Sequence, residues 1–138
     1  MTRINCIPPA ELSRQHLVAE YRELPRIYAL VRQAIARGEL PDDRRNPTEY
    51  TLGRGHIRFF YSRLGYLTNR QRSLVAEMQR RGYQPTFVEV DQLAEGIPAE
   101  WCRDWQPTEA AIALNRARIA ERSAAARLPL DTAPSPPS

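Results

Sequence analysis

Five polar side chains near the start of the chain have the types and spacing of a group that acts together. At about 100° per residue in a helix, Gln15, Arg22 and Arg26 share one face, and His16 and Glu23 share the neighbouring one. Cations therefore lie beside a carboxylate that is able to assist proton movement. A solvated helix face has the same appearance, and these residues alone leave both interpretations open.

The chain also lacks lysine. All 20 side chains counted as Lys plus Arg are Arg, and a guanidinium stays protonated and cannot act as a nucleophile at neutral pH. If the protein uses an amine nucleophile, the candidate is the α-amine at the chain terminus, whose reference pKa of about 7.7 to 8.0 leaves a reactive neutral fraction. Genomic codon bias also explains the missing lysines, and the two explanations are compatible.

The element that carries the five polar residues is a helix that we expect to run from about Glu11 to Arg37-Gly38. A cation followed by glycine is typical of a helix end. Because Pro25 has no N–H for the carbonyl of Tyr21, a bend is expected there. Apolar side chains at three- and four-residue intervals form the opposite stripe: Leu17, Tyr21, Leu24, Tyr28, Val31 and Ile35.

Two further helices are predicted. The second ends at Arg80-Arg81-Gly82, and the third begins after the N-cap Thr108 and runs to about Arg127. Thr86 to Val90 alternates like a strand but has no partner, so we interpret it as an extended loop. The apolar stripe of the second helix comprises Ile57, Phe60, Leu64, Leu67, Leu74 and Met78.

These elements predict an all-α fold, a single compact domain of three principal helices with an N-terminal segment packed against them and irregular connections. The domain is expected to span residues 1–127. Residues 128–138 are rich in Pro and Ser and are expected to be a disordered tail.

Composition limits the classes of function. The chain has 138 residues, is 42% hydrophobic, has a mean hydropathy of −0.56, and contains no run of about 20 apolar residues that could span a membrane. Cys6 and Cys102 are expected to be free thiols. The two histidines are far apart and no CxxC spacing or glycine-rich phosphate loop occurs, so we expect no metal, no cofactor and no nucleotide.

The charge of +4 favours a polyanionic partner. The arginines form two clusters, and each fits either phosphate binding or a solvated basic face. The first cluster is Arg70, Arg72, Arg80 and Arg81, and the second is Arg116, Arg118, Arg122 and Arg127.

Several motifs, in order, resemble the pyrimidine-dimer DNA glycosylases of the phage endonuclease V family. The most specific is the run from Gln15 to Arg26, QHLVAEYRELPR, behind an N-terminus that reads MTRIN. The resemblance covers roughly residues 2 to 125. It continues through Gly53-Arg54-Gly55-His56, Phe59-Phe60-Tyr61, Arg70-Gln71 and Glu109-Ala110-Ala111-Ile112-Ala113.

The resemblance implies an all-α enzyme that excises ultraviolet-induced pyrimidine dimers and then cleaves the abasic site by β-elimination. It implies that the α-amine of Thr2, exposed by removal of Met1, forms a Schiff base with the sugar, and that Glu23 is the catalytic carboxylate. DNA or lesion contacts carry over to Arg3, Gln15, His16, Arg22, Arg26, Arg118 and Arg122, the last standing where the phage enzyme has a lysine. The implied partner is damaged double-stranded DNA. Because the chain has neither a spanning run nor the apolar block of a signal peptide, we expect a cytoplasmic protein, a monomer that associates with the nucleoid when bound to DNA.

One departure bears on the substrate. The phage enzyme ends in an aromatic-rich tail associated with lesion recognition, whereas this chain ends in Pro and Ser. Two alternatives to dimer excision therefore stay open, an abasic-site lyase with a different or broader lesion range and a non-catalytic α-helical DNA-binding protein.

Overall fold

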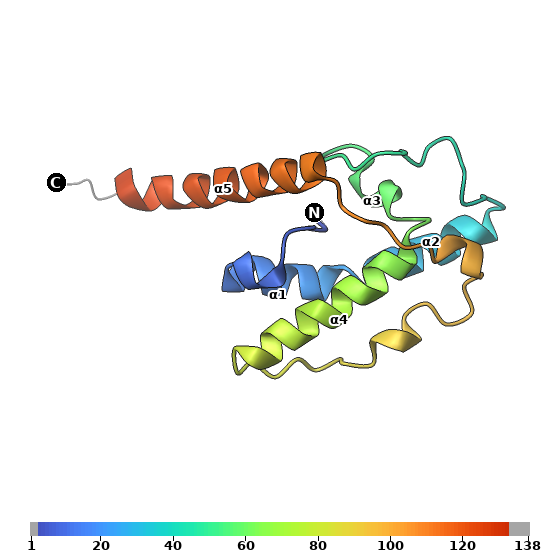
Figure 1. The fold of residues 1–138 in the computed structure, drawn as a ribbon, viewed down its shortest axis with the longest axis horizontal. Helices are drawn as coiled ribbons and strands as arrows, with labels where there is room; N and C mark the ends of the chain where they lie inside the picture. Colours follow the sequence, from blue (N-terminus) through green and yellow to red (C-terminus); the bar gives the residue numbers. More distant parts are fainter. Residues whose placement is uncertain (1–2, 133–138) are drawn as a thin grey trace. The chain divides into compact units, whose positions relative to one another are not determined.

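The computed structural model describes residues 3–132, and these residues form helices and irregular connections without a β-strand (Figure 1). This confirms the predicted all-α class. The chain divides into two compact units, Met1–Gln106 and Pro107–Ser138, which are described in turn. None of the helices in the described part combines the length and apolarity needed to cross a membrane.

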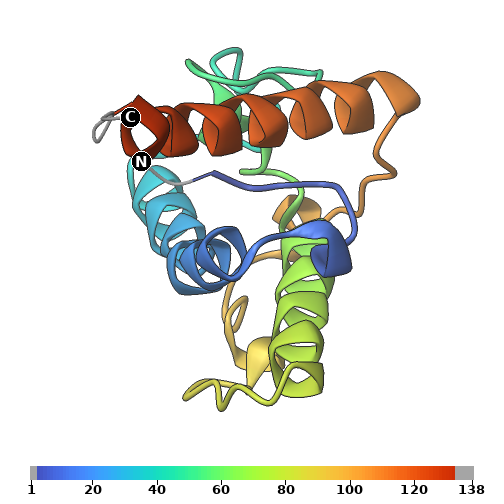
Figure 2. The same cartoon turned by 90° about the vertical axis from the view of Figure 1, so that its left-hand side faces the viewer.

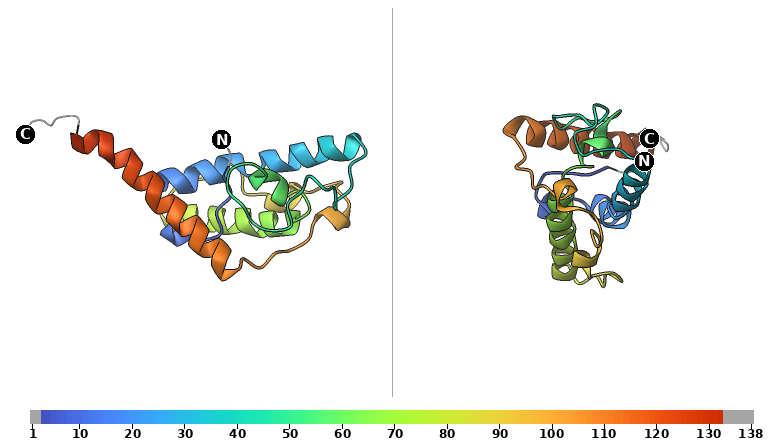
Figure 3. Two further views of the ribbon diagram at one scale, coloured as in Figure 1. Left: turned by 90° about the horizontal axis from the view of Figure 1, so that it is seen from above. Right: turned by 90° about the vertical axis from the view of Figure 1, so that its right-hand side faces the viewer.

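The first predicted helix is two helices, α1 (Arg14–Glu23) and α2 (Arg26–Ala36), which follow one another nearly in line (Figure 3). The start is later than predicted because a 3-10 turn, η1 (Pro9–Glu11), precedes it and Ser13 is the N-cap. The Ser13 hydroxyl accepts a hydrogen bond from the His16 N–H at 3.2 Å. The predicted end is confirmed, with Arg37 as C-cap and Gly38 at φ +89°.

The interruption falls at Pro25, as predicted, and a distant side chain compensates for it. In an unbroken helix the Tyr21 carbonyl would accept from the N–H of residue 25, which proline lacks. The amide of Gln71 donates to that carbonyl instead, at 3.0 Å. Gln71 is fully buried on α4 (Leu64–Arg80), which packs against α1, so the bend is built into the core.

The second predicted helix is also interrupted, and here the prediction of one continuous helix from Ile57 to Met78 is wrong. The chain forms a short helix, α3 (His56–Phe59), turns through residues 60–63, and then begins α4. Phe59, Phe60 and Tyr61 are all buried. Consecutive residues of a helix point about 100° apart, so a straight helix could not place three neighbouring aromatic rings in one core.

The connection between α4 and the second unit is irregular, as predicted for Thr86 to Val90, and contains the 3-10 turns η2 (Val90–Gln92) and η3 (Ala99–Trp101). It is held to the helices at several points. The Tyr21 hydroxyl accepts from the Phe87 N–H at 2.9 Å. At Gly65 a Cβ would lie 2.6 Å from the Cys102 carbonyl oxygen, so the connection passes where only glycine leaves room.

The second unit contains α5 (Glu109–Thr132). The hydroxyl of Thr108 accepts from the Ala111 N–H at 3.0 Å, which confirms the predicted N-cap. The helix continues to Thr132, beyond Arg127, where its end was predicted. Residues 133–138, the rest of the predicted tail, lie outside the described residues.

Candidate active site

The first described residues form an extended segment that is unusual for a chain terminus, because it is almost completely buried. The exposed fractions are 0% for Ile4, 3% for Asn5, 8% for Cys6 and 1% for Ile7, and Arg3 is half-buried. Ends of chains ordinarily fray unless tertiary contacts tie them down. The segment crosses from the side of α1 to that of α4 in Figure 2. Thr2, the predicted nucleophile, lies outside the described residues.

Side chains from two other regions hold the backbone of this segment. The imidazole Nε2 of His56 accepts from the Ile4 N–H at 2.8 Å, and the Tyr50 hydroxyl donates to the Ile4 carbonyl at 3.2 Å. From α4, the Tyr66 hydroxyl donates to the Asn5 carbonyl at 3.2 Å and Arg70 donates to the Ile7 carbonyl at 2.6 Å. Four backbone groups between residues 4 and 7 are therefore fixed by partners far away in sequence.

The tautomer of His56 follows from its two neighbours. Its Nδ1 lies 2.8 Å from the Thr51 carbonyl oxygen, which can only accept, so Nδ1 carries the proton and Nε2 is free to accept from Ile4. Gly55, at φ +87°, turns the chain into α3 directly before His56. A Cβ on this glycine would lie 2.9 Å from Pro47 Cγ, so both backbone and packing require glycine there.

A buried ion pair braces the same segment. Arg70 and Glu20 form a two-pronged contact, Nε to Oε2 at 2.8 Å and Nη2 to Oε1 at 3.1 Å, and the Asn5 amide donates to Oε1 at 2.8 Å. Burial by itself would lower the pKa of Arg70, but the charge of Glu20 and its hydrogen bonds outweigh burial and raise that pKa. Arg70 therefore stays charged, and it also holds the Ile7 carbonyl.

The polar face predicted from the sequence lies on α1 and the first residue of α2. Gln15, Arg22 and Arg26 are exposed, while Glu23, the last residue of α1, is half-buried. His16 is half-buried, and its Nδ1 lies 3.0 Å from the Ser13 hydroxyl. Among the residues whose side chains the structure describes, none forms a hydrogen bond or ion pair with the side chain of Glu23, Arg22 or Arg26, which leaves these charges available to a ligand.

Arg118 and Arg122 belong to the second unit, on α5, where Arg118 is half-buried and Arg122 is exposed. The Nε of Arg118 lies 3.5 Å from an oxygen of Glu121, one turn away. A pair at the surface with a well-exposed glutamate contributes little stability, so the guanidinium of Arg118 can exchange Glu121 for a stronger anion.

The arginines of the first cluster predicted from the sequence all have partners within the protein. Arg70 is buried, Arg72 pairs with Asp91, and Arg80 and Arg81 both pair with Glu77. Hydrogen bonds from Arg80 and Arg81 lower the pKa of Glu77 to about 2. Arg81 also donates to the Leu12 carbonyl at 2.8 Å, so this cluster ties down the chain between the N-terminal segment and α1.

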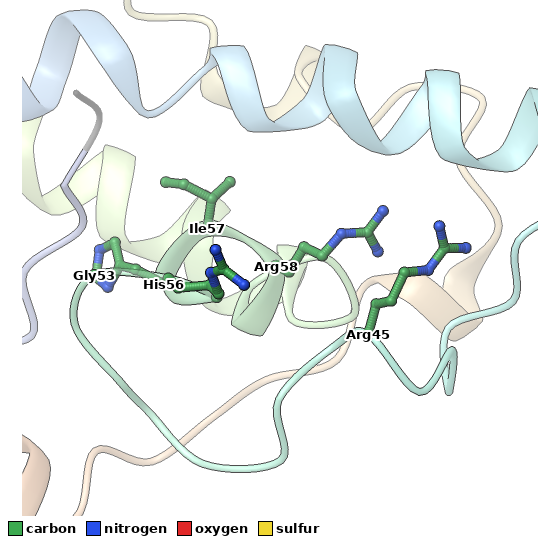
Figure 4. Close-up of a pocket in the computed structure, with 7 residues that line it drawn as sticks. Arg45, Gly53, His56, Ile57 and Arg58 are labelled. Atoms are coloured by element: carbon green, nitrogen blue, oxygen red, sulfur yellow. The ribbon is translucent and has the colours of Figure 1, made fainter.

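A surface pocket of about 350 Å³ lies beside the loop that carries His56. His56 stands at one end, and Arg45 and Arg58 stand at the other (Figure 4). Both arginines are already paired with Glu39, and Arg45 with Asp43 as well.

The described residues contain no group of three or more side chains arranged to hold a metal ion.

Three residues that hold the N-terminal segment were not predicted from the sequence: Tyr50, Tyr66 and Glu20. Arg70 carried a signal that could have been used, because it lies between Leu67 and Leu74 at helical spacing and is therefore on the apolar stripe of α4. A cation at a buried position requires a buried partner.

The family model described as pyrimidine dimer DNA glycosylase matches residues 1–88. The chain belongs to this family. The match includes the N-terminal segment, α1 to α4, and the side chains from Tyr50 to Arg70 that hold the segment, whereas α5 lies beyond it. The glycosylase is therefore a DNA repair protein whose substrate is DNA.

Proposed function

We propose that this glycosylase couples excision of ultraviolet-induced pyrimidine dimers to cleavage of the resulting abasic site, with the α-amine of Thr2 as nucleophile after removal of Met1. The observation that carries the proposal is the anchored N-terminal segment. Both the N–H and the carbonyl of Ile4 are held by distant side chains, and Ile4 follows Thr2 by two residues in the sequence.

The chemistry needs no metal. The neutral amine attacks C1′ of the damaged nucleotide, and the glycosyl bond breaks with its electron pair leaving on the base. The attached nitrogen passes a proton to the ring oxygen O4′ and then expels it, so the C1′–O4′ bond breaks, the sugar ring opens and a protonated imine remains. The imine acidifies the C2′ proton, whose removal expels the 3′ phosphate by β-elimination. The absence of lysine supports this assignment, because no side-chain amine competes with the terminus.

Glu23 is the proposed catalytic carboxylate. It stabilises the cationic sugar and assists removal of the C2′ proton. Its environment supports the role in two ways. It has no ion pair within the described residues, and it is the last residue of α1, where the helix dipole is unfavourable to a carboxylate. A carboxylate that lies at the unfavourable end of a helix, with no ion pair to offset it, is typical of a functional site.

Most of the proposed DNA contacts are made by arginines, which neutralise phosphates and fix the register without reading sequence. The full set is Arg3, Gln15, His16, Arg22, Arg26, Arg118 and Arg122. We propose that the protein acts on damaged duplex DNA as a cytoplasmic monomer.

Borohydride trapping tests the proposal. Reduction in the presence of abasic duplex should give a stable cross-link to the peptide that begins with Thr2, and intact mass should show that Met1 is absent. Because the chain has no lysine, acetylation with an amine-selective reagent modifies the terminus alone and should abolish the cross-link. A cross-link that survives acetylation, or one that maps to another peptide, would refute the assignment.

A comparison of two DNA substrates tests which lesion the protein acts on. Cleavage of dimer-containing duplex by the full chain supports dimer excision, whereas cleavage of abasic duplex with ultraviolet-irradiated duplex left intact supports an abasic lyase of different range. Failure on both substrates leaves the non-catalytic DNA-binding alternative.

A further inference from the structure

We propose that Tyr50, His56 and Tyr66 are positioning residues, which hold the N-terminal segment so that the terminal amine meets the sugar. The inference rests on the proposed function, because it assigns these three side chains a task in the reaction of that amine. None of them is placed at the reacting atoms. They act through the backbone of Ile4 and Asn5.

The first argument is the nature of the contacts. Both hydrogen-bonding groups of Ile4 are engaged, its N–H by His56 and its carbonyl by Tyr50, so the backbone on either side of this residue cannot shift without breaking a hydrogen bond. Tyr66 adds a third bond at the next carbonyl. Breaking bonds in a buried site leaves unsatisfied polar groups, which makes the anchored position strongly preferred.

The second argument is the rigidity of the groups that do the holding. The Tyr50 ring packs edge-on to His56 at 5.5 Å and stacks on Trp105 at 5.6 Å between centroids. The Tyr66 ring stacks on Phe60 at 5.8 Å and meets the same Trp105 edge-on at 5.1 Å. Both hydroxyls are therefore carried on rings that one aromatic cluster locks in place, as a positioning device requires.

The third argument comes from burial. Desolvation raises the pKa of both Tyr50 and Tyr66, so the hydroxyls stay protonated and remain donors throughout the pH range in which the amine reacts. The anchoring bonds thus persist while the terminus itself titrates.

The molecule offers a matched control. Tyr28 is another buried tyrosine whose hydroxyl bonds to Thr68 at 2.7 Å, on α4, and none of its hydrogen bonds reaches the N-terminal segment. Burial raises the pKa of Tyr28 to about 12, and it raises the pKa of Tyr50 and Tyr66 as well. Tyr28→Phe therefore removes an equivalent buried hydroxyl without touching the proposed anchor.

The test compares Tyr50→Phe, Tyr66→Phe and the double variant with Tyr28→Phe at a temperature where circular dichroism shows all four to be folded. We expect the single-turnover rate of borohydride trapping on abasic duplex to fall by about tenfold or more in the double variant and by less in each single one. Affinity for duplex with a non-reactive abasic analogue should stay within about twofold of wild type, as should the trapping rate of Tyr28→Phe. If the double variant does not fold, the two single variants carry the comparison.

Reductive alkylation by formaldehyde separates positioning from intrinsic reactivity, because a small freely diffusing aldehyde needs no alignment and the terminus is the one amine of the chain. The inference is supported if formaldehyde alkylates all variants equally while trapping on DNA is impaired in the Tyr50 and Tyr66 variants. Unimpaired trapping in the anchor variants, or an equal loss in Tyr28→Phe, overturns it. If the wild-type cross-link maps away from the N-terminal peptide, the proposed function fails and the inference fails with it.

Discussion

The N-terminal segment and the polar face of α1 are neighbours in sequence but opposite in character. Residues 4–7 are buried, and their backbone is bonded by side chains that are otherwise committed to the core. Arg22, Glu23 and Arg26 stand at the surface without internal partners in the described part of the chain. The difference indicates a division of labour, in which one region fixes the position of a terminus and the other leaves its charges free for a ligand.

The largest expected effect tests the polar face of α1. Glu23→Gln keeps the shape and removes the charge, so strand cleavage should fall by roughly 10² to 10⁴, the usual range for losing an acid–base group. Because Glu23 makes no internal ion pair in the described residues and lies at the negative end of a helix, the melting temperature should not fall. Single-turnover cleavage and thermal unfolding measure the two properties. Cleavage within about tenfold of wild type, about 1.4 kcal/mol, would remove Glu23 from the mechanism.

The next effect tests the N-terminal segment, where we expect the free energy of unfolding to change rather than the cleavage chemistry itself. Arg70→Met leaves Glu20 as an uncompensated buried carboxylate and should cost about 3 to 5 kcal/mol of unfolding free energy. Adding Glu20→Met should recover part of the loss, since the stranded charge is then gone. Urea unfolding of the wild type, both single variants and the double variant gives the coupling energy, and additive losses would contradict the picture of one buried unit.

The smallest effect concerns the bend at Pro25, which lies within the polar face. Gln71→Leu removes the donor to the Tyr21 carbonyl and should cost about 1 to 3 kcal/mol, the usual penalty for an unsatisfied buried group. Because the bend separates Glu23 from Arg26, cleavage should also drop by more than the stability loss explains. Gln79→Leu, at an exposed position on the same helix, is the control for the substitution itself. A loss of stability with an unchanged cleavage rate would show that the bend is only structural.

Local sequence was sufficient for several parts of the fold. Thr108 was predicted as a cap, Pro25 as a bend and Gly38 as a helix end, and each prediction is confirmed because it depends on residues within one or two turns. The polar face of α1 was likewise predictable, since positions on a helix follow from spacing alone. The order of motifs was enough to indicate the family, which the comparison confirms.

The tertiary structure alone decided which polar residues are buried and what they hold. His56 meets Ile4 across 52 positions and Arg70 meets Ile7 across 63, and no periodicity in the chain encodes such pairs. The break at residues 60–63 has the same origin, because burying three consecutive rings depends on a core formed by distant elements. Sequence by itself determined the helices and the chemistry they display, since both depend on near neighbours. Long-range packing determined how the terminus is held, because only the folded chain brings its partners together.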